Sequence, residues 1–108
     1  MSEETATQSP GEETRFPLPP ASFSFLVLSL RAQAEMQLGL MHFGEEEKPK
    51  PDLMLARHTL DLMAVLLEKT KGNLTLEEQR MLENSVTELR FRYVQIAEES
   101  AKQPAQKD

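Results

Sequence analysis

The sequence predicts a small all-α domain made of three helices, and three observations lead to this fold class. The chain has 108 residues, of which 39% are hydrophobic but only 6% are aromatic, so any core must be aliphatic. It contains no cysteine, so its stability must come from hydrophobic burial and not from disulfides. Apolar residues recur at helical spacing in three segments. Links that contain Pro or Gly separate these segments.

The two ends of the chain are predicted to lie outside this domain. Residues 1–20 contain four acidic residues and four prolines and offer little apolar surface to bury, which indicates a disordered tail. Residues 102–108 include Pro104 and are polar apart from Ala105, so they are predicted to form a second disordered tail. The helical domain is therefore expected over residues 21–101.

The first helix is expected over about residues 23–40, with Ser22 as its N-cap. Its apolar residues form two stripes on nearly opposite sides, and two thin polar seams separate the stripes. In a three-helix monomer one stripe reaches only one neighbour, so we expect a second copy or another protein to cover it. The first stripe contains Phe23, Val27, Leu30, Ala34, Leu38 and Met41, and the second contains Phe25, Leu28, Ala32, Met36 and Gly39. The seams contain Ser24, Arg31 and Glu35 on one side and Ser29, Gln33 and Gln37 on the other.

The second helix is expected over about residues 53–71. Residues 44–51 precede it as a loop, because two prolines and alternating charges block regular structure there. Asp52 is placed to act as its N-cap, and Gly72 is the residue type most often found just past a helix end.

The third helix is expected over about residues 76–100, beginning with a capping box formed by Thr75 and Glu78. The short link at residues 72–74 predicts that the second and third helices form an antiparallel hairpin. Apolar residues at alternating spacings of four and three predict its buried side, namely Leu82, Val86, Leu89, Tyr93 and Ile96.

The charge and motif content exclude several function classes. The net charge of -6 argues against binding to nucleic acids or to anionic membrane surfaces. No apolar run approaches the roughly 18 residues that a membrane span needs. The acidic start of the chain lacks the basic region of a secretion signal, so a cytoplasmic location is expected. The four glycines are isolated and no metal-ligand spacing is present, so no cofactor or metal is expected.

Arg57, His58 and Asp61 form the most suggestive polar cluster, because their spacing places them on one side of the second helix. This polar ligand face supports one function hypothesis, a domain or enzyme that binds a small anionic ligand. The competing interpretation is a solvated helix face, on which an Arg57 to Asp61 pair contributes a few tenths of a kcal/mol.

Several segments of the chain resemble a known family. Together they cover most of residues 22–97, and they include RHTLDLMA at 57–64, EKTKGNLT at 68–75, the acidic pair at 77–78, FLVLSL at 25–30, AQA at 32–34, ELR at 88–90 and RYV at 92–94. On these segments the chain resembles the bacterial domain-of-unknown-function 1844 family. The resemblance implies a small, mainly helical bacterial domain, and it brings no activity, ligand or catalytic residue with it.

The function that we expect first is a non-enzymatic interaction or scaffold protein. It would form a homodimer, or bind another protein, through the second stripe of the first helix, with Leu28, Ala32, Met36 and Gly39 in close helix contacts. Phe91 and Val94 lie away from the buried side of the third helix and form a second candidate contact surface. Enzyme activity is not expected, since no serine lies in a recognisable nucleophile setting.

Overall fold

A computed structural model of the chain describes residues 17–41 and 50–102. These residues form three helices, α1 at Phe23–Gln37, α2 at Leu53–Lys69 and α3 at Leu76–Ala101, and the described part contains no strand. The predicted all-α fold of three helices is therefore confirmed. The predictions for most of the two tails and for the acidic part of the loop concern residues 1–16, 42–49 and 103–108, which lie outside the described residues.

Each helix begins at the predicted N-cap. The Ser22 hydroxyl accepts a hydrogen bond from the backbone N–H of Phe25 at 3.0 Å, and the Asp52 carboxylate accepts one from Leu55 at 3.1 Å. The predicted capping box of α3 is also present. Its threonine hydroxyl accepts from the Glu78 N–H at 3.1 Å, and the glutamate carboxylate accepts from the Thr75 N–H at 2.9 Å. These bonds satisfy backbone donors that a helix leaves unpaired at its start, so the short-range signals were sufficient to position all three starts.

The ends of α1 and α2 differ from the prediction. Helix α1 ends at Gln37 and not near residue 40, because Gly39 adopts a left-handed conformation with φ 78°. The N–H groups of Gly39 and Leu40 donate to the carbonyls of Met36 and Glu35 at 3.0 and 2.9 Å, which is the pattern of a Schellman motif. Gly39 is therefore a helix-terminating residue, buried in the monomer, and not part of a helical stripe.

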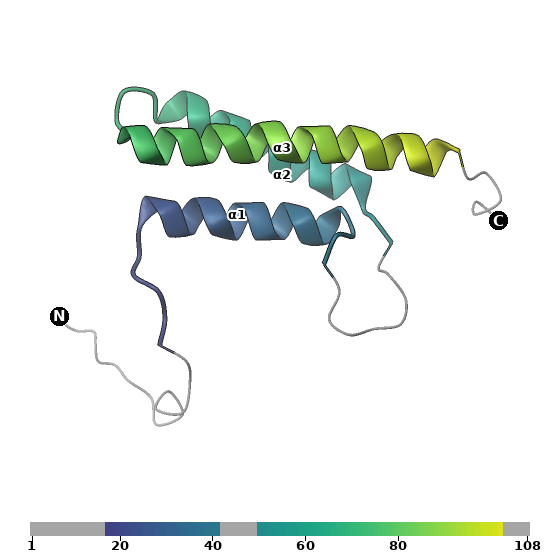
Figure 1. Cartoon of the computed structure of the whole chain (residues 1–108), viewed down its shortest axis with the longest axis horizontal. Helices are drawn as coiled ribbons and strands as arrows, with labels where there is room; N and C mark the ends of the chain where they lie inside the picture. Colours follow the sequence, from purple (N-terminus) through teal and green to yellow (C-terminus); the bar gives the residue numbers. More distant parts are fainter. Residues whose placement is uncertain (1–16, 42–49, 103–108) are drawn as a thin grey trace.

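Helix α2 ends at Lys69, two residues before the predicted end, and Gly72 follows in a left-handed conformation with φ 84°. The chain then reverses direction, so α2 and α3 form the predicted antiparallel hairpin (Figure 1). Helix α1 runs antiparallel to α2 and parallel to α3, and all three pairs of helices pack against each other (Figure 1). The last turns of α3 extend beyond the ends of the other two helices (Figure 1).

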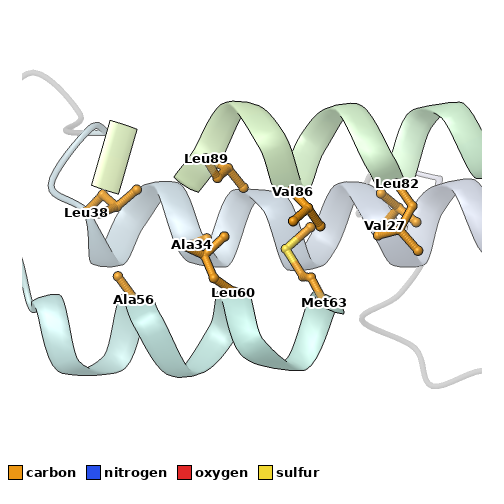
Figure 2. Close-up of a cluster of buried hydrophobic side chains, with 9 residues drawn as sticks. All are labelled: Val27, Ala34, Leu38, Ala56, Leu60, Met63, Leu82, Val86 and Leu89. Carbon is orange, nitrogen blue, oxygen red and sulfur yellow. The ribbon is translucent and has the colours of Figure 1, made fainter. Parts of the chain in front are cut away.

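The core lies where the three helices meet, and it is aliphatic as predicted. Figure 2 shows its side chains converging from all three helices, with Met63 of α2 reaching toward Val86 of α3. Tyr93 and Ile96 are partly buried against this cluster. All five residues predicted for the buried side of α3 therefore lie in or against the core. The buried members are Val27, Ala34, Leu38, Ala56, Leu60, Met63, Leu82, Val86 and Leu89.

The capping box leads to a first prediction. We expect Thr75→Ala to lower the free energy of unfolding by about 1 kcal/mol, because the start of α3 loses the acceptor for one backbone N–H. Urea unfolding followed by far-UV circular dichroism measures this change. Thr87→Ala is the matched control, since Thr87 is exposed within α3 and lies away from its start. Equal losses of stability in the two variants would contradict the assigned role of Thr75.

Candidate functional site

Helix α1 has apolar residues on two opposite sides, and only one side is covered by the rest of the chain. Val27 and Ala34 on the inner side are fully buried. On the other side Phe25, Leu28 and Met36 are 40%, 50% and 51% exposed. We call these three residues, together with the half-buried Ala32 between them, the outer face of α1. The second predicted stripe therefore lies largely in solvent in a single copy of the protein, with Gly39 excluded from it.

The outer face of α1 carries no charge. Arg31 and Glu35 are the only charged residues of this helix; they pair with each other, and Arg31 also contacts α3. The guanidinium of Arg31 pairs with Glu35 at 3.0 Å and with Glu88 at 3.0 Å, and it donates to the Ser85 hydroxyl at 3.3 Å. The charged groups of α1 are therefore used inside the bundle, along one of the two predicted polar seams.

The same contacts affect the pKa of Arg31. Burial by itself lowers the pKa of this guanidinium, but the hydrogen bonds and negative charges of Glu88 and Glu35 outweigh burial and raise its pKa above the usual value. The positive charge of Arg31 thus lies between the carboxylates of Glu35 and Glu88, at the contact between α1 and α3.

The second polar seam of α1 joins it to α2. Thr59 is almost completely buried, and its hydroxyl donates to the Gln37 side-chain oxygen at 2.6 Å and accepts from the Gln33 amide at 3.3 Å. The sequence predicts Gln33 and Gln37 in a polar seam, but it does not identify Thr59 as their buried partner. It also does not identify Ser85 of α3 as a partner of Arg31. A lone Thr or Ser within an apolar helix side is the only signal for such a partner.

Helix α2 also has exposed apolar residues. Leu55 and Leu62 lie about one turn before and after Thr59, and both are close to half exposed. Because Thr59 lies on the line along which α1 and α2 meet, these two leucines lie on the side of α2 next to the polar seam of Gln33 and Gln37. Met54 and Val65 are also exposed and lie further round α2.

The other candidate contact residues lie on α3. Phe91 and Val94 are exposed, one turn apart, and they alternate with Leu89 and Tyr93 on the core side of the helix. They therefore lie on the outer side of α3. Charged residues surround this position along the helix, including Arg90 and Glu98, in contrast to the outer face of α1.

The three side chains of the polar ligand face do not form a connected binding site. Arg57, His58 and Asp61 are exposed on α2, and no hydrogen bond or ion pair joins them to one another.

A pocket of about 180 Å³ lies at the other end of α2, beside the hairpin turn. Its polar side chains are paired, Lys71 with Glu68 at 3.7 Å and Gln79 with Glu83 at 3.1 Å. The full lining is Ala64, Leu67, Glu68, Lys71, Leu74, Gln79 and Glu83.

Residues 17–41 and 50–102 contain neither a candidate metal-binding cluster nor a candidate membrane-spanning helix. Within them, no three His, Asp or Glu side chains gather closely enough to hold a metal ion. None of the three helices combines the length and the apolar character that crossing a membrane requires.

Comparison with known proteins gives one family. The family model described as a domain of unknown function, DUF1844, matches residues 20–95, which include all of α1 and α2 and most of α3. Neither the curated proteins nor the solved structures contain a match. The match covers more than half of the chain and contains the segments that carried the resemblance, so the chain belongs to the DUF1844 family.

Proposed function

We propose that this protein is a non-enzymatic helical interaction protein that self-associates through the outer face of α1. One observation carries the proposal, namely that Phe25, Leu28 and Met36 are 40% to 51% exposed on a helix side that has no charged residue. Contiguous exposed apolar surface is typical of protein contact sites, and the centres of such sites are depleted of charged residues.

The contrast with the other helices supports the choice of α1. The exposed side of α2 includes Arg57, Asp61 and Lys69, and the exposed side of α3 includes many more charged residues. Single exposed apolar residues among charges are normal on a protein surface and need no partner. Only α1 presents apolar residues to solvent without charged neighbours on the same side of the helix.

The test is the substitution Leu28→Asp in the full chain. We expect the parent protein to form a stable assembly and the variant to dissociate, with an apparent dissociation constant raised at least about 100-fold. A carboxylate buried without a partner costs several kcal/mol, and about 3 kcal/mol corresponds to a 100-fold change. Light scattering across a dilution series measures the mass of each protein, and circular dichroism shows that both are helical.

Val94→Asp is the matched control, because Val94 is also 50% exposed but lies on the outer side of α3. We expect this variant to keep the mass of the parent. A parent chain that remains monomeric throughout the dilution series would contradict the proposal. Dissociation by Val94→Asp and not by Leu28→Asp would move the contact to α3 and would equally contradict it.

A further inference from the structure

We draw no further inference here: the strongest candidate, the pocket of about 180 Å³ beside the turn between α2 and α3, has only exposed polar side chains in its lining, and these pair with each other, Lys71 with Glu68 and Gln79 with Glu83, so no buried polar group marks it as a ligand site.

Discussion

Leu82→Ala is expected to lower the free energy of unfolding by about 3 kcal/mol. Leu82 is completely buried in the three-helix core, and Figure 2 shows its side chain beside Val27 of α1. The substitution removes buried apolar atoms and leaves a cavity that the surrounding helices fill only in part, which makes Leu→Ala one of the most costly core changes. Since small domains are stable by only about 5–15 kcal/mol, this loss is a large part of the total.

Urea unfolding followed by far-UV circular dichroism measures the effect, at one fixed protein concentration because association adds apparent stability. Leu76→Ala is the matched control, since Leu76 lies on the same helix but is 63% exposed. We expect the control to change stability by less than about 0.5 kcal/mol. Similar effects of the two substitutions would show that Leu82 does not occupy the core position described.

Ala34→Leu is expected to destabilise the domain by about 2 kcal/mol, because a larger side chain overpacks the core. Ala34 is fully buried where α1 approaches α2, and Figure 2 shows Leu60 beside it. A larger side chain must push the two helices apart, and forcing extra methylene groups into a packed core costs about 1–3 kcal/mol. The displacement also stretches the hydrogen bonds that Thr59 makes with Gln33 and Gln37.

The matched control for this prediction is Ala32→Leu, the same substitution two residues earlier on the outer face of α1. Both variants are compared by thermal and urea unfolding at a low protein concentration. We expect Ala32→Leu to leave the unfolding free energy within about 0.5 kcal/mol of the parent, because Ala32 lies outside the core. A greater loss from Ala32→Leu than from Ala34→Leu would contradict the assignment of inner and outer sides.

Much of the local structure was predictable from the sequence. Ser22, Asp52 and the Thr75 capping box all mark helix starts, because each cap satisfies backbone donors within three residues of itself. The predictions of the helix ends were less accurate than those of the starts. Gly39 fits a helical stripe by its position, but its left-handed conformation depends on backbone bonds that form only as the chain leaves the helix.

The candidate contact surface was partly predictable. The spacing of Leu28, Ala32 and Met36 identifies a second apolar side of α1, since periodicity reports the angle of each residue around its own helix axis. The same reasoning did not place Leu55 and Leu62 on the side of α2 next to a polar seam of α1. Their position beside α1 follows from the antiparallel packing of α1 on α2, and single-helix periodicity contains no information about the packing of two helices.

The fold class, the three helix starts, the inner side of α3 and the two apolar sides of α1 could all be predicted from the sequence. Each of these properties depends on residues within a few turns of one helix. The partners of the polar seams, in contrast, depend on helix packing: Arg31 pairs with Glu88 of α3, and Gln33 and Gln37 bond to Thr59 of α2. These contacts join residues 22 to 57 positions apart, and they exist only because the three helices pack with one particular set of sides facing inward.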